Sequence, residues 1–180
     1  EGGATAKNAP NRQLERVQEL AQGARQRGIR RPGSLTRQLA WLVNSDVPRV
    51  QIAVTEWIGH WRRTDQDNTL AAIASATEKP IALRKAAIRG LTAFGETQTE
   101  RLIKIFNSET EFDIRSAIVS GLVTLNADTA AKLAVELLGS GEDNDPSELV
   151  STFLGHKGAA AKLTAALKGK TTQDRNSTRL

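Results

Sequence analysis

Apolar residues recur every three or four positions in several stretches of the chain, a spacing that gives a helix one apolar face. The clearest stretches contain Ala87, Leu91 and Phe94, and then Ile118, Leu122 and Leu125. Polar segments that contain Gly, Pro or Asp separate these stretches, and such residues commonly begin or end helices. The pattern therefore predicts helices joined by short connections.

The same pattern occurs more than once. Residues 84–95 align without gaps with residues 115–126, with Arg, Ala, Gly and Leu in matching places. A weaker copy begins at Gln51, about one period before Arg84. An amphipathic stretch precedes each copy, at residues 35–43, 70–76 and 102–106, and residues 133–138 begin a fourth unit. Two helices in each period of just over thirty residues are typical of a helical-hairpin repeat.

Local signals predict where the helices begin and end. Asp145-Pro146-Ser147-Glu148 is the clearest start, with an Asp cap, Pro in the first turn and an acid three residues after the cap. Asp65 or Asp67 can cap an earlier helix, and Pro80 suits a first helical turn. Two copies end at residues that tolerate the left-handed backbone conformation, Gly95 and Asn126.

One hairpin cannot bury its apolar face alone, but stacked hairpins can. We therefore predict an all-α protein with a repeat domain over residues 11–168. This domain is an α-solenoid of about four hairpins, preceded by one extra helix near residues 12–22. Residues 1–10 and 169–180 are polar and lack periodicity, so we expect a disordered N-terminal tail and a flexible C-terminal tail.

The repeated Arg84 and Arg115, each followed by small or aliphatic residues and then Leu, resemble HEAT-like repeats. The resemblance implies a right-handed superhelix. It also implies that the arginine joins a ladder of polar contacts with an Asp near the hairpin turn, and Asp113 lies two residues before Arg115. We therefore expect Arg84 and Arg115 to have structural roles.

The amino-acid composition limits the class of protein and the chemistry that this chain can carry out. With 39% hydrophobic and 25% charged residues, the chain falls in the globular class. It has no Cys, which excludes disulfides, thiol chemistry and Cys-ligated zinc within these residues. No apolar run approaches the roughly 20 residues that span a bilayer, so we expect no membrane insertion. The first residues contain neither Met nor a signal-peptide core, so we expect an excised or processed fragment.

Charge is concentrated near the N-terminus. Residues 1–63 have a net charge of +6, and the remainder has a net charge of −1. This skew supports nucleic-acid binding as an alternative function. The candidate residues for it are Arg25, Arg27, Arg30, Arg31, Arg62 and Arg63. Trp57 and Trp61 could stack bases, but their spacing favours the apolar face of a helix, with Trp41 as a neighbour.

The segment from Asp145 to Leu167 is similar to the closing helical segment of large secreted haem-binding proteins of planctomycetes, the membrane-bound dehydrogenase domain proteins. Ala159 stands where that pattern has a second Gly after Lys157-Gly158. The resemblance implies an extracytoplasmic spacer between a β-propeller and a c-type cytochrome module. No C-x-x-C-H motif occurs, so we expect no haem and no other cofactor on this segment.

No motif for nucleophilic catalysis or phosphate binding occurs in the sequence, so we expect a segment without enzymatic activity. His60 and His156 belong to no metal-spacing motif, and Glu56 with His60 supplies too few ligands, so we expect no metal site. We predict a scaffold or protein-interaction segment that binds a protein partner or neighbouring domains of a larger chain. Its candidate contact residues are Glu56, Arg62, Arg63, Arg89 and Ser120.

Overall fold

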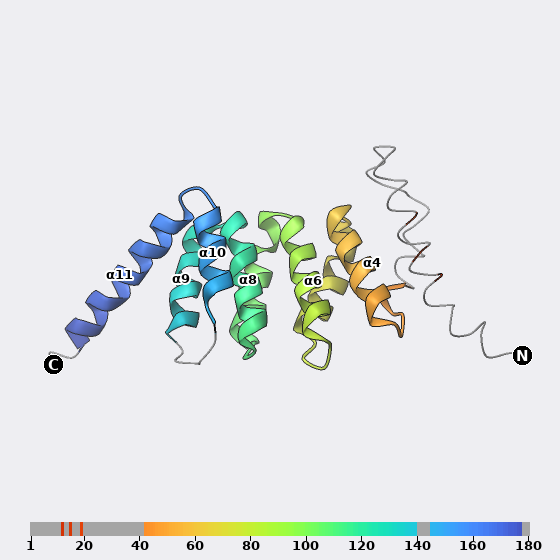
Figure 1. Ribbon diagram of the computed structural model, residues 1–180, viewed down its shortest axis with the longest axis horizontal. Coiled ribbons are helices and arrows are strands. Elements are labelled where there is room, and N and C mark those ends of the chain that lie inside the picture. Colours follow the sequence, from red (N-terminus) through yellow and green to blue (C-terminus); the bar gives the residue numbers. More distant parts are fainter. Residues whose placement is uncertain (1–11, 13–14, 16–18, 20–41, 140–144, 178–180) are drawn as a thin grey trace, which may run out of the picture. The chain divides into compact units, whose positions relative to one another are not determined.

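The computed structural model describes residues 12, 15, 19, 42–139 and 145–177. The elements along the last two ranges are helices without exception (Figure 1), which confirms the all-α class. In order they are α4 (Pro48–His60), the 3₁₀ turn η2 (Thr64–Gln66), α5 (Asp67–Ser75), α6 (Ile81–Ala93), the 3₁₀ turn η3 (Glu96–Gln98), α7 (Thr99–Ser108), α8 (Phe112–Leu125), α9 (Ala127–Leu138), α10 (Ser147–Gly155) and α11 (Ala159–Ser177).

The helices fall on the segments whose apolar spacing predicts them. We call α4, α6, α8 and α10 the second helices, since each contains the copied segment or its counterpart in the fourth unit. We call α5, α7, α9 and α11 the first helices. The predicted helix near residues 12–22, the helix that begins at residue 35, and Trp41 lie wholly or largely outside the described residues.

The contacts divide the chain into two compact units, residues 1–94 and residues 95–180. The division falls at Gly95, whose φ of 99° is in the left-handed region predicted for it. Glycine adopts this conformation without the steric cost that a Cβ atom brings. The continuity of one repeat domain over residues 11–168 stays a prediction.

In the first unit, α6 packs against both α4 and α5, and α4 and α6 lie side by side (Figure 1). Val50, Val54 and Ile58 recur every four residues along α4 and are fully buried. Leu70 of α5 and Leu91 of α6 are also fully buried. Burying an aliphatic side chain of this size contributes about 1.5–3 kcal/mol, so these faces hold the unit together.

In the second unit, α8 packs against α7, α9 and α10, and α11 packs against α9 and α10. Its largest fully buried side chains include Phe106 of α7 and Phe153 of α10. Ile118 and Leu122 of α8 are buried as their spacing predicts, whereas Leu125 is partly exposed at the end of that helix.

The two repeated arginines have structural roles, as expected. Arg84 of α6 is 3% exposed, and its Nε donates a hydrogen bond of 2.9 Å to the carbonyl oxygen of Ala74 near the end of α5. Arg115 of α8 lies over the ring of Phe106 near the end of α7, 4.1 Å from its centroid. Each arginine thus joins a second helix to the last turns of its own first helix. Arg115 also binds Glu136 of α9 at 2.6 Å, so its anionic partner comes from the following hairpin.

The residues predicted at helix starts lie at the starts of α5, α6 and α10, but Pro146 is the N-cap of α10 and not a residue of its first turn. Asp145 Oδ1 accepts a hydrogen bond of 2.9 Å from the backbone N–H of Ser147, the first residue of α10. Hydrogen bonds from Ser147, first from its side chain and then from its backbone N–H, lower the pKa of Asp145. Pro80 stands immediately before α6 instead of within its first turn. Asp67 is the first residue of α5, and no side-chain hydrogen bond caps that helix.

Two expectations about helix ends were wrong. Asn126 has a φ of −154°, so it does not take the left-handed conformation; its Oδ1 instead accepts the N–H of Thr129 and caps α9. Asn serves at helix starts because its short side chain reaches a free backbone donor. A flexible tail was expected at residues 169–180, but α11 runs from Ala159 to Ser177 and includes most of that segment. Residues 168–177 contain no Pro, so nothing in their covalent structure stops the helix.

Candidate interaction surface

Glu56 of α4 and Arg89 of α6, two predicted contact residues, form an ion pair. Arg89 Nη2 donates to Glu56 Oε1 at 2.8 Å, and the two side chains are 61% and 48% exposed. Glu56 is the sixth residue of the copy that begins at Gln51, and Arg89 is the sixth residue of the copy that begins at Arg84. Equivalent positions of successive copies therefore meet across the α4–α6 contact. The sixth residue of the third copy is Ser120, which lies on α8 of the second unit and is partly exposed.

Close approach of the two helix backbones brings this pair together. A Cβ atom on Gly59 of α4 would lie 2.5 Å from the Cα of Gly90 of α6. Because neither glycine has a side chain, α4 and α6 touch backbone to backbone at this level. Gly90 lies within the second copy of the repeated pattern, but the sequence does not identify Gly59 as the residue that faces it.

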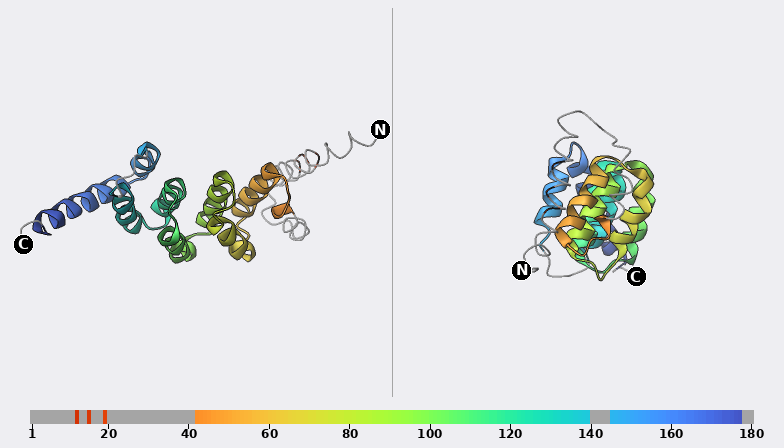
Figure 2. Two further views of the ribbon diagram at one scale, coloured as in Figure 1. Left: turned by 90° about the horizontal axis from the view of Figure 1, so that it is seen from below. Right: turned by 90° about the vertical axis from the view of Figure 1, so that its right-hand side faces the viewer.

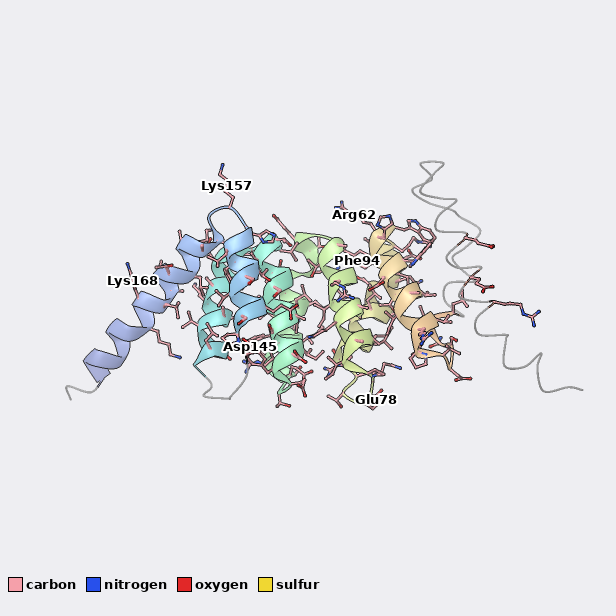
Figure 3. The ribbon with its side chains drawn as sticks, in the orientation of Figure 1. Arg62, Glu78, Phe94, Asp145, Lys157 and Lys168 are labelled. Carbon is pink, nitrogen blue, oxygen red and sulfur yellow. The ribbon has the colours of Figure 1, made fainter. Side chains whose placement is uncertain are left out.

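Arg62 takes part in the turn that ends α4. Its φ of 48° is in the left-handed region, the one such non-glycine value among the described residues. The N–H of Arg62 donates to the Gly59 carbonyl at 3.0 Å, and the N–H of Arg63 donates to the Ile58 carbonyl at 3.0 Å. These two bonds form the Schellman motif, in which glycine is the usual left-handed residue. The side chain of Arg62 is exposed (Figure 3).

Arg63 is engaged by a local acid. Its Nε and Nη2 donate to the two carboxylate oxygens of Asp65, each at 2.8 Å. The hydrogen bond from Arg63 is the main cause that lowers the pKa of Asp65 to about 2. The Arg63 side chain is only 15% exposed. A partner would therefore find a neutralised pair at this position instead of a free cation.

Trp57 and Trp61 pack against each other on α4. Their ring centroids are 5.0 Å apart and the rings are perpendicular, an edge-to-face arrangement. Trp61 is buried and Trp57 is partly exposed, which confirms the predicted core role most clearly for Trp61. His60 is exposed beside them, and its helix neighbour Glu56 is paired with Arg89.

The predicted surface is thus distributed over both units. Glu56, Arg62, Arg63 and Arg89 lie on or just after the second helices of the first unit, and Ser120 lies in the second unit. Of the residues proposed for nucleic-acid binding, Arg25, Arg27, Arg30 and Arg31 lie outside the described residues.

Among the described residues, no three His, Asp or Glu side chains gather as they would around a metal ion. Within that same part of the chain, no helix combines the length and the apolar character needed to cross a bilayer.

Comparison with known proteins returned no match to a family model, to a curated protein or to a solved structure.

Two features of the second unit were not singled out from the sequence. Leu154 of α10 is 70% exposed and Leu167 of α11 is 40% exposed. The sequence could have predicted the exposure of Leu154, because Leu149 and Phe153 define the buried stripe of α10 and Leu154 lies outside this stripe.

Proposed function

We propose that this chain is a non-catalytic scaffold, a HEAT-like α-solenoid whose second helices present a polar surface to a protein partner. The contact between Glu56 and Arg89 is the observation that carries the proposal. It joins equivalent positions of successive copies, one repeat apart in the sequence, as stacking of like units requires.

The charge on this surface favours a protein partner. Glu56 pairs with Arg89, and Arg63 pairs with Asp65, so an acid accompanies each of these two arginines in the first unit. Paired charges create a weak net potential, whereas binding to nucleic acid depends on a strong positive one. Mixed charges instead suit a complementary protein surface, which they position in one register.

Site-specific photo-crosslinking in cells that produce the complete protein tests this proposal. A photo-reactive amino acid at Arg62 or Ser120 should give a discrete protein adduct or a crosslink to another domain of the same chain. The matched controls are Ala72 and Lys104, exposed residues of the first helices α5 and α7. Adducts from the controls alone, or from none of the four positions, would overturn the proposed surface.

The larger context is proposed from the resemblance of residues 145–167 to secreted haem-binding proteins. On this proposal the chain is a spacer in an extracytoplasmic protein that binds haem through another module. The test is to sequence the gene on both sides of this segment and to stain the full product for covalent haem. A C-x-x-C-H motif with haem-dependent peroxidase staining would support this context, and a full-length product without either would contradict it.

Nucleic-acid binding is the alternative, favoured by the net charge of +6 over residues 1–63 and by the exposed Arg62. The pairing of Arg63 with Asp65 weighs against it. Fluorescence anisotropy with labelled single-stranded and duplex DNA at low salt distinguishes the two functions. Binding that falls steeply with added salt would favour the alternative, and no binding at low salt would remove it.

A further inference from the structure

Helix α11 of the second unit runs parallel to α9. Lys162, near the start of α11, donates to Asp128 near the start of α9 at 2.6 Å. Eight residues later, the ammonium of Lys170 donates to the carbonyl oxygen of Val135, in the last turn of α9, at 3.5 Å. Contacts that advance together along both helices show that the two run in the same direction. The Lys170 ammonium therefore lies at the C-terminal end of α9.

The face that α11 turns toward the unit changes in character along the helix. Ala159 is 1% exposed and Leu163 is 7% exposed, so apolar contacts hold the first half. Ala166 and Lys170 continue the same face at helical spacing, and both are partly exposed. Figure 2 shows α11, in dark blue, extending away from α9 toward its C-terminal end. At this end a long charged side chain, instead of an apolar one, makes the contact with α9.

The Lys170 ammonium complements the end of α9 electrostatically. The carbonyl end of a helix has a partial negative charge that a nearby cation stabilises. The last turn of α9 contains no basic residue, and its acid, Glu136, pairs with Arg115 of α8. Lys170 thus supplies, from another helix, the cation that the last turn of α9 lacks.

Gly139, the residue after α9, provides the space for this ammonium. A Cβ atom on Gly139 would overlap the Nζ atom of Lys170 and would lie 3.2 Å from the carbonyl oxygen of Val135. The backbone of Gly139 has a φ of −89° and a ψ of −2°, so it is not in the left-handed region that favours glycine. The position of Lys170 therefore explains why a residue without a side chain stands here.

We propose that the second half of α11, residues 168–177, is a strap that charge holds against α9. It stays docked while the Lys170 ammonium lies at the end of α9, and it is released when this charge is removed or screened. A free segment of about ten residues is too short to remain helical in water, so release converts it into flexible chain. Salt thereby controls whether the end of α9 is covered, a property that goes beyond the proposed scaffold function.

Hydrogen–deuterium exchange of the full chain, followed by mass spectrometry, tests the strap. At low salt, Lys170→Gln should speed the exchange of residues 171–177 by about two- to fivefold, the factor expected for loss of a cation at a helix end. Residues 163–167 should keep their exchange rate, because Leu163 stays buried. Lysine and glutamine have similar helix propensities, so a change in intrinsic helicity does not account for this result. Lys170→Arg keeps the charge and should keep the protection.

Two further measurements separate the effect of charge from that of packing. Gly139→Ala displaces the ammonium without changing any charge, and it should speed the exchange of residues 171–177 as Lys170→Gln does. About 1 M salt, where the Debye length is about 3 Å, should release the strap of the unchanged chain but have little effect on Lys170→Gln. Lys162→Gln is the matched control. Its ion pair is exposed and lies beside Leu163, so residues 171–177 should keep their protection.

Three results would overturn the strap. These are equal exchange of residues 171–177 in Lys170→Gln and the unchanged chain, equal loss of protection in Lys170→Arg, and faster exchange that extends to residues 163–167. The last result would mean that α11 detaches as a whole. None of these measurements depends on the crosslinks at Arg62 and Ser120, so a failure of the strap leaves the scaffold proposal in place.

Discussion

The contact between Gly59 and Gly90 gives the most specific prediction about stability. An added Cβ at Gly59 would lie 2.5 Å from the Gly90 Cα, a backbone atom. An added Cβ at Gly90 would first meet the tip of Leu70, with Cδ1 at 2.6 Å, while the Gly59 Cα would lie 3.6 Å away. The same substitution thus meets a backbone in one case and a side-chain end in the other.

These distances set the expected magnitudes. Carbon atoms pack best at about 3.5–4.0 Å, so Gly59→Ala must push α4 and α6 apart by about 1 Å. Overpacking of this kind costs roughly 1–3 kcal/mol, against a helix-propensity gain of about 1 kcal/mol or less near the end of α4. Gly90→Ala requires a rotamer change of Leu70, about 0.5–1.5 kcal/mol, which the propensity gain largely offsets. We expect Gly59→Ala to be less stable than Gly90→Ala by about 1–2 kcal/mol.

Urea unfolding followed by tryptophan fluorescence measures this difference, because all three tryptophans lie in residues 1–94, the first unit. With a slope of about 2 kcal/mol/M, the two midpoints should differ by roughly 0.5–1 M. Gly169→Ala of α11 is the matched control, since its added Cβ meets no atom within 4 Å. Circular dichroism should show this control to be neutral or stabilised. The reasoning fails if Gly59→Ala is as stable as Gly90→Ala or the unchanged chain.

Three further predictions concern the same unit. Thr55→Val should raise the unfolding free energy by about 1 kcal/mol in urea titrations, because the Thr55 hydroxyl is buried without a hydrogen-bond partner. Arg62→Gly should stabilise by about 1 kcal/mol, and Arg62→Ala should not, because only glycine relieves the left-handed backbone; thermal melts of both variants check this. Asp65 has a folded pKa of about 2, below its unfolded value near 3.9. The stabilisation that the ionised carboxylate gives the folded state is therefore complete above the unfolded pKa and is lost as pH falls toward 2. Asp65→Asn should remove this pH-dependent part of the unfolding free energy, which is about 1 kcal/mol or less because the pair is exposed. Thermal melts between pH 5 and 2 measure it.

Each of these predictions has a contradicting result. A destabilised Thr55→Val would mean that the hydroxyl has a partner in solution. Equal melting temperatures for Arg62→Gly and Arg62→Ala would mean that α4 ends in a different turn. An unchanged acid transition in Asp65→Asn would mean that the pairing of Asp65 with Arg63 does not stabilise the folded state.

The helices were predictable because apolar spacing along a chain directly encodes which face of a helix is buried. Val50, Val54 and Ile58 illustrate this, since their spacing alone places them together in the core. Asn126 was harder, because the same side chain can end one helix or cap the next, and only the backbone path decides between them. The extent of α11 was missed because a polar helix can form without an apolar stripe.

The candidate surface was less predictable than the helices. Position in the repeat suggested that Glu56, Arg89 and Ser120 are equivalent, but a periodic pattern does not specify which charges pair across two helices. Arg63 was predicted as a contact residue, yet Asp65 two positions later binds its guanidinium. The exposure of Leu154 depends on which neighbours a helix has, and that is a property of the assembled unit.

Stacking of like repeats with α4 and α6 in register is the central claim, and nuclear Overhauser effects between the α-protons of Gly59 and Gly90 test it most directly. The close approach of the two backbones predicts a strong cross-peak between these protons, although they belong to different helices and lie far apart in the sequence. Contacts from Gly59 to α5 alone, without a cross-peak to Gly90 in a spectrum where both glycines are assigned, would contradict the account.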